Sequence, residues 1–156
     1  MPDIYHACRV GDLPLLKTLI AQNPALVNTL NEGGFPPLIL ATYNDQLEAA
    51  QYLVEQGANL EERDRSGNTA LMGAVFKRHE EQITWLLEQG ADVNTQNYNG
   101  ATALTYACTF AGPAVVQQLL AAGAQPTIKD ARGMTPVDHA RMQGNQQVVN
   151  LLENNS

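Results

Sequence analysis

One glycine recurs in this chain at a fixed interval of 33 residues, and leucine, alanine and a second glycine keep the same interval. A fixed period of this length indicates a repeated supersecondary unit, and neighbouring units of such an array bury a shared core. The aligned series are Gly34, Gly67, Gly100 and Gly133; Leu38, Leu71, Leu104 and Val137; Ala41, Ala74, Ala107 and Ala140; Leu53, Leu86, Leu119 and Leu152; and Gly57, Gly90 and Gly123.

Residues 64–96 show what one unit contains. A polar, turn-forming cluster at its start predicts a hairpin-like loop. Thr69 is then expected to cap a short helix over 70–77. Apolar residues at helical spacing predict a second helix over 80–89, and the glycine after it is a common helix terminator. Neither helix is wide enough to enclose a core, so helix pairs are predicted to stack on one another.

Two segments resemble the ankyrin repeat: Gly133-Met-Thr-Pro-Val-Asp-His-Ala140 and Leu86-Leu-Glu-Gln-Gly-Ala-Asp-Val-Asn94. The resemblance covers nearly the whole chain and implies an all-α solenoid of stacked helix-turn-helix units with short hairpin loops. We expect a single domain, 1–156, divided into an N-terminal capping unit (1–30), three full repeats (31–63, 64–96, 97–129) and a C-terminal capping unit (130–156).

The chain departs from the family pattern in two ways. The family usually has a histidine after its Thr-Pro-Leu motif, where this chain has Ile39, Met72, Thr105 and Asp138. Stability is therefore expected to depend more on packing than on hydrogen bonds at that position. The first unit also needs one extra residue, which we place at Asn23-Pro24 as a longer connection.

The resemblance also implies where function is located. Ankyrin arrays typically bind proteins through the hairpin tips and the exposed face of each first helix, which together line a concave groove. Carried over to this chain, these positions contain several aromatic, arginine and methionine side chains, which are common interface anchors. The predicted partner-binding residues are Phe35, Tyr43, Asn44, Arg65, Asn68, Phe76, Lys77, Tyr98, Phe110, Arg132, Met134 and Met142. No cofactor is expected.

The charge balance narrows the class of partner. Sixteen acidic residues stand against nine basic ones, whereas nucleic-acid binding draws on clustered lysine and arginine. The chain lacks the long apolar run of a membrane span, and its first residues lack the features of a signal peptide. We therefore expect a cytoplasmic monomer that binds a protein partner, with no nucleic acid and no membrane.

An enzymatic function finds little support in the sequence. The chain contains two serines and three histidines, without the spacing of a catalytic triad or a metal site. Cys108 and His139 fall in adjacent units and could act as nucleophile and base, which makes a small enzyme the least favoured alternative. Cys8 and Cys108 hold equivalent places three units apart, too far for a disulfide, so both are predicted to be buried thiols.

The unit 97–129 has an unusual surface. No charged side chain occurs between Asp92 and Lys129, whereas the unit 31–63 carries six acidic residues and one basic residue. Either this unit has a neutral, partly buried corner, or it carries an apolar docking patch. The second interpretation makes a structural or self-associating module the main alternative to a non-catalytic interaction module that inhibits or scaffolds its partner.

Overall fold

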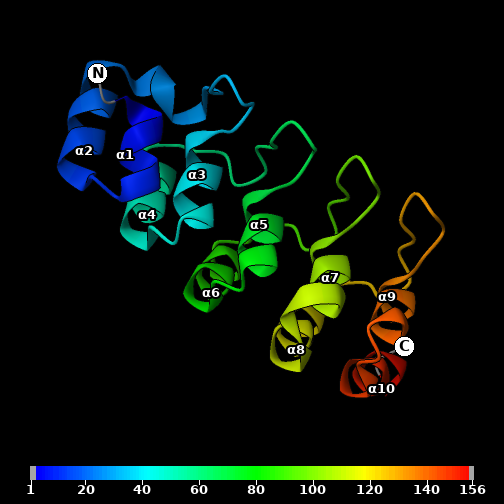
Figure 1. The fold of residues 1–156 in the computed structure, drawn as a ribbon. Coiled ribbons are helices and arrows are strands. Elements are labelled where there is room, and N and C mark those ends of the chain that lie inside the picture. Colours follow the sequence, from blue (N-terminus) through cyan, green and yellow to red (C-terminus); the bar gives the residue numbers. More distant parts are fainter. Residues whose placement is uncertain (1–2, 155–156) are drawn as a thin grey trace.

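The computed structural model describes residues 3–154, and this part of the chain consists of paired helices without a strand. Each helix pair lies against the next, and hairpin-like loops project from one side of the stack (Figure 1). The predicted all-α architecture of stacked helix-turn-helix units is confirmed.

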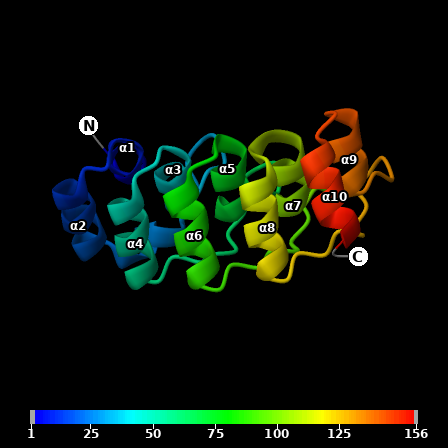
Figure 2. The same cartoon turned by 90° about the horizontal axis from the view of Figure 1, so that it is seen from below.

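The helices form two rows, one of first helices next to the hairpins and one of second helices on the other side (Figure 2). The first helices are α1 (Ile4–Val10), α3 (Pro37–Tyr43), α5 (Ala70–Lys77), α7 (Ala103–Tyr106) and α9 (Pro136–Met142). The second helices are α2 (Leu13–Gln22), α4 (Leu47–Glu55), α6 (Glu80–Glu88), α8 (Pro113–Ala121) and α10 (Gln146–Asn154).

A buried alanine at the same place in every unit allows the rows to pack closely. Its methyl group is fully covered, and its carbonyl accepts the amide of the residue five positions later, which closes the corner between the two helices of each pair. A larger side chain would push the neighbouring helix away, because interiors are packed without spare volume. These alanines are Ala7, Ala41, Ala74, Ala107 and Ala140.

The predicted caps are present. The Thr69 side chain accepts the amide of Met72 at the start of α5, and Thr135 caps α9 with Pro136 in the first turn. Of the four residues in place of the family histidine, Ile39 and Met72 are buried, as expected where packing takes over. The other two depart from that expectation and form reciprocal capping boxes. Their side chains accept the amides of the capping threonines; the pairs are Thr102 with Thr105 and Thr135 with Asp138.

The first unit differs from the rest after its second helix. Asn23 ends α2 and accepts the amide of Ala25, and a 3₁₀ helix, Pro24–Asn28, follows. The fixed φ of proline suits the first turn of such a helix. The extra residue that we placed at Asn23-Pro24 therefore lies at the start of this added helical turn.

The fourth unit has a different corner. Helix α7 continues into a π-helical turn, Ala107–Ala111, before Gly112 turns the chain with φ 95° and ψ −176°. Only glycine adopts this conformation readily, and Pro113 restricts the residue before it. In the second and third units the corner lies one position earlier, at Asp45 and Arg78, where φ is near 58°. The neutral segment noted in the sequence is therefore an altered corner.

Glycines hold the hairpins at their close spacing. A Cβ atom on Gly67 would lie 2.8 Å from the Tyr98 ring, and one on Gly100 would lie 2.8 Å from the amide nitrogen of Ala131. The same hairpins are joined by backbone hydrogen bonds, such as the Tyr98 amide to the Ser66 carbonyl at 3.1 Å. The hairpins thus form a continuous row beside the first helices.

Candidate partner-binding surface

Three aromatic side chains meet on the surface of the first helices next to the hairpins. The ring centroids of Phe76 and Phe110 lie 5.0 Å apart in an edge-to-face arrangement, and Tyr106 lies 6.0 Å from Phe76. Phe76 and Phe110 nevertheless remain 40% and 47% exposed. We call these three residues the aromatic strip. Exposed aromatic rings that pack on one another are typical of the anchors found at protein interfaces.

A hollow of about 510 Å³ lies on the N-terminal side of this strip. We call it the aromatic hollow. Its walls come from α3, α5, α7 and the hairpin at 64–68, and most of them are apolar. It is lined by Phe35, Ile39, Leu40, Tyr43, Asp64, Ser66, Asn68, Thr69, Met72, Gly73, Phe76 and Tyr106.

Gly73 explains why space remains there. The equivalent position in the second, fourth and fifth units carries Leu40, Tyr106 and His139, each with a side chain on this surface. At Gly73 an added Cβ would already lie 3.3 Å from the Tyr43 ring. The missing side chain leaves the floor of the hollow open between Tyr43 and Phe76.

A polar network closes the hairpin side of this hollow. The Asn97 amide donates to Asn68 at 2.8 Å and to the Tyr106 hydroxyl at 3.1 Å, and that hydroxyl lies 3.3 Å from Asn68 Oδ1. Burial raises the pKa of the Tyr106 phenol, the hydrogen bond from Asn97 opposes this, and the nearby charge of Asp64 raises it further. The Asn68 side chain therefore joins two repeats as well as bordering the hollow.

A second hollow, of about 470 Å³, lies on the other side of the strip. We call it the histidine hollow. Its sides come from α7, the π-helical turn, α9 and the hairpins at 97–101 and 130–132. The residues that line it include Thr105, Tyr106, Thr109, Phe110, Asp130, Arg132, His139, Met142 and Gln143.

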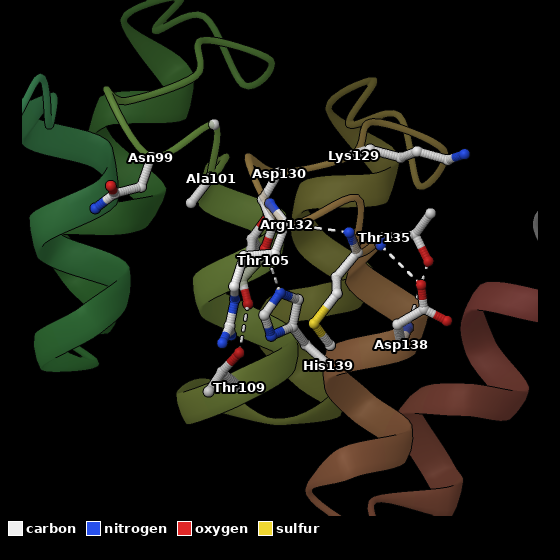
Figure 3. A network of polar contacts seen from close by, with 12 residues as sticks. Asn99, Ala101, Thr105, Thr109, Lys129, Asp130, Arg132, Thr135, Asp138 and His139 are labelled. Atoms are coloured by element: carbon white, nitrogen blue, oxygen red, sulfur yellow. Dashed lines mark hydrogen bonds and ion pairs between the residues drawn. The ribbon is translucent and has the colours of Figure 1, made fainter.

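Asp130 and His139 form a close pair in the wall of the histidine hollow. His139 Nε2 donates to Asp130 Oδ2 at 2.7 Å, and both side chains are mostly covered (Figure 3). Burial alone would raise the pKa of Asp130, but hydrogen bonds from His139 and from the amides of Met134 and Arg132 lower it below the ordinary value. This hairpin is fastened to α9 by a charged hydrogen bond.

The predicted site residues fall into three places. Phe35, Tyr43, Asn68 and Phe76 line the aromatic hollow, whereas Phe110, Arg132 and Met142 line the histidine hollow. Arg65 and Tyr98 lie together in a third hollow at the hairpin tips, where Tyr98 is 69% exposed. Lys77 lies beside the aromatic hollow, with its ammonium 5.1 Å from the centre of the Tyr43 ring.

Three predicted residues, Lys77 among them, line none of these hollows. Asn44 is exposed at the end of α3 and donates to the Leu40 carbonyl at 2.7 Å, and Met134 is half-buried in the last hairpin. The prediction also missed Asp64, Gly73 and Tyr106. The 33-residue step could have found two of them, because position 40 and its equivalents carry a leucine, a glycine, a tyrosine and a histidine in turn.

The Cys108 thiol has none of the properties of a nucleophile. It is 2% exposed, it does not line the histidine hollow, and burial raises its pKa to about 12. The thiolate is the reactive form, so burial and the raised pKa both disfavour Cys108 as a nucleophile. His139 is already paired with Asp130. As predicted, Cys8 and Cys108 are buried free thiols.

Two further features of residues 3–154 bear on the site. Within that range, no group of three or more histidine, cysteine or acidic side chains is arranged to hold a metal ion. None of the described helices has both the length and the apolar character that crossing a bilayer requires.

Three relatives resemble parts of the chain. Ankyrin repeat and SAM domain-containing protein 6 of Rattus norvegicus is 41% identical over 76 residues, 48% of this chain and 9% of that protein. Alpha-latrocrustotoxin-Lt1a of Latrodectus tredecimguttatus is 32% identical over 62 residues, 40% of this chain and 4% of the toxin. The NAD-capped RNA hydrolase NUDT12 of Homo sapiens is 35% identical over 66 residues, 42% of this chain and 14% of that enzyme.

The chain thus spans a small fraction of the length of each of these relatives. A family model described as ankyrin repeats in three copies matches residues 4–97 and 82–156, which together include every helix of both rows. The helix pairs, the hairpins and the capping threonines agree with that match. The chain belongs to the ankyrin repeat family.

Proposed function

We propose that this chain is a non-catalytic interaction module that binds a protein partner through the aromatic strip and the two hollows beside it. Ankyrin repeats in general mediate protein–protein interaction and are not catalytic. The observation that carries the proposal is the exposure of Phe76 and Phe110, which pack on each other yet keep large apolar areas open. The chain would act on its partner as an inhibitor or a scaffold.

The proposal assigns the contacts to particular residues. Phe35, Tyr43 and Phe76 would receive apolar groups at the aromatic hollow, while Phe110, Met142 and Arg132 would do so at the histidine hollow. Arg65, Asn68, Lys77 and Tyr98 would form the polar rim, and Asn44 and Met134 would contribute at the edges. Residues 1–156 would serve as one domain, with 1–30 and 130–156 as its capping units.

The remaining features of the proposal rest on charge and thiol chemistry. A formal net charge of −7 disfavours nucleic acid and anionic membrane surfaces as partners. Two buried free thiols suit a reducing compartment, which supports a cytoplasmic location. We further propose that the array acts as a monomer.

The test compares capture by two triple variants. Replacing Tyr43, Phe76 and Phe110 by alanine removes the apolar anchors, and we expect the yield of co-purified partner from the native cell to fall at least about tenfold. The control replaces Glu48, Glu55 and Glu88, on the second helices, by alanine and should capture the partner normally. Equal capture by both variants, with unchanged helical circular dichroism, would remove this surface from consideration.

A self-associating module based on the fourth unit is the second candidate. Its support is the uncharged corner with Phe110 exposed. Because the Phe110 ring packs on Phe76 of the third unit, its exposed area is continuous with the aromatic strip. Sedimentation equilibrium decides between the two: a dimer that Phe110→Ala dissociates would favour self-association, whereas a monomer at high concentration would exclude it.

A further inference from the structure

The hairpins of the last three repeats begin with the same kind of turn. In each, an aspartate or asparagine side chain accepts two backbone amides through Oδ1. Asp64 accepts the amides of Ser66 and Asn68, both at 2.9 Å. Asn97 and Asp130 do the same in the next two hairpins. Position 64 and its equivalents therefore keep one conformation, which directs the second side-chain atom toward the first helix.

The partner of that second atom lies nine residues further along the chain. Asn97 Nδ2 donates to the Tyr106 hydroxyl at 3.1 Å, and Asp130 Oδ2 accepts from His139 Nε2 at 2.7 Å. Nine residues after Asp64 stands Gly73, which has no side chain. The third repeat therefore keeps the acceptor and lacks the donor.

The Asp64 carboxylate is consequently available to the aromatic hollow. Within residues 3–154, no side chain donates to its second oxygen. Asp64 is the one charged residue among those that line the hollow, and its charge is close enough to raise the pKa of Tyr106. The aromatic rings of Phe35, Tyr43, Phe76 and Tyr106 line the same hollow.

We propose that the aromatic hollow receives an arginine side chain of the partner protein, with its guanidinium on Asp64. A carboxylate beside aromatic rings matches this group, because guanidinium donates two parallel hydrogen bonds and stacks on ring faces. The guanidinium supplies the donor that His139 provides in the last repeat. This inference rests on the proposed function and specifies its partner's chemistry.

Two cationic side chains of the chain itself lie nearby, and each is already engaged. Lys77 holds its ammonium over the Tyr43 ring, and Arg65 donates to the Glu32 carbonyl at 2.8 Å. Neither lines the aromatic hollow. Within the described range, Asp64 is therefore the one charged side chain that lines it.

The test is a titration of the full chain with small amides, followed by ¹H–¹⁵N NMR. The probes are N-acetyl-arginine methylamide, its lysine counterpart and its citrulline counterpart, which has nearly the shape of arginine without the charge. We expect the arginine probe to shift the amides of Gly73, Phe76 and Tyr106 saturably. The citrulline probe should bind at least about tenfold more weakly, and the lysine probe should fall between them.

Matched variants test the carboxylate directly. Asp64→Asn keeps the turn acceptor, as Asn97 shows at the equivalent place, and should weaken arginine binding at least about tenfold. Asp130→Asn makes the same change in the last repeat and should leave it unchanged. Gly73→His supplies the missing internal donor and should also abolish binding.

Each outcome has one meaning. Equal binding of arginine and citrulline, or an unchanged affinity in Asp64→Asn, overturns the inference, as do shifts confined to Met142 and His139. If Asp64→Asn still captures the cellular partner fully while the aromatic triple variant does not, the arginine inference fails and the proposed function stands. If the triple variant captures the partner normally, the proposed function fails, whether or not the arginine probe binds.

Discussion

The third and fifth repeats build the same turn and leave different surfaces. In the fifth, Asp130 is bound by two backbone amides and by His139, so its carboxylate is used entirely within the chain. In the third, Asp64 is bound by the two amides, and Gly73 leaves the remaining oxygen open. A single position on the first helix thus decides whether the second oxygen of the turn aspartate is bound within the chain or left open.

The largest expected effect is a difference in unfolding free energy between alanine variants of the two aspartates. Asp130→Ala removes three hydrogen bonds, one of them to a histidine, and should lower the free energy of unfolding by about 3 kcal/mol. Asp64→Ala removes two and should cost about 1.5 kcal/mol. Urea unfolding followed by circular dichroism measures both, and equal losses would mean that the His139 pair contributes nothing.

Tyr106→Phe tests the contact between Asn97 and Tyr106, which is the uncharged equivalent of the contact between Asp130 and His139. It removes the hydroxyl that Asn97 and Asn68 share, and should cost about 1 kcal/mol of unfolding free energy. Tyr98→Phe, which removes a hydroxyl from an exposed hairpin tip, is the control and should change stability negligibly. If both variants unfold at the same urea concentration as the parent, the network joining the third and fourth repeats has no energetic weight.

Acid should weaken the fifth repeat selectively. Because the pKa of Asp130 is below its ordinary value of 3.8, folding favours the charged form. Its contribution is complete above pH 3.8 and is lost as the pH falls through the lower native pKa. The stability difference between the parent and Asp130→Asn, which we expect to be below about 1 kcal/mol, should therefore shrink in that window. A difference that is constant from pH 7 to pH 2.5 would contradict this.

The smallest effect concerns the open position itself. Gly73→Ala replaces a helical glycine, which favours folding by about 0.5 to 1 kcal/mol, but the new methyl group lies 3.3 Å from the Tyr43 ring. We expect a net gain of about 0.5 kcal/mol by thermal unfolding. Gly90→Ala, at φ 87° with no neighbour within 4 Å, should instead destabilise. A loss at Gly73 would show that the Tyr43 ring cannot move aside.

The sequence predicted what the repeat imposes on every unit. The local pattern of residues 64–96 was enough to predict the Thr69 cap and the helix 70–77, and the resemblance to ankyrin repeats placed Phe76 and Phe110 on the surface. The sequence did not reveal the π-helical turn at Ala107–Ala111. That corner depends on the backbone conformation of Gly112 and on Pro113 after it. A repeat period does not predict such a local conformation.

The polar contacts in the two hollows could not be predicted from the sequence either. The pairing of Asp130 with His139 joins a hairpin to a helix nine residues later, and its strength depends on burial and orientation, which spacing alone does not give. The sequence suggested His139 as a base for Cys108, whereas the fold uses it as a donor to Asp130. The open carboxylate of Asp64 follows from the turn geometry, in which both backbone amides bind the same oxygen.

The two buried thiols have a practical consequence. Cys8 lies in the first repeat and Cys108 in the fourth, and burial raises the pKa of each to about 12. A thiol reagent can reach either one when its own repeat opens, so the two modification rates report on opposite parts of the array. Solenoids are stabilised by nearest-neighbour contacts, and unequal rates would measure directly how independently the two parts unravel.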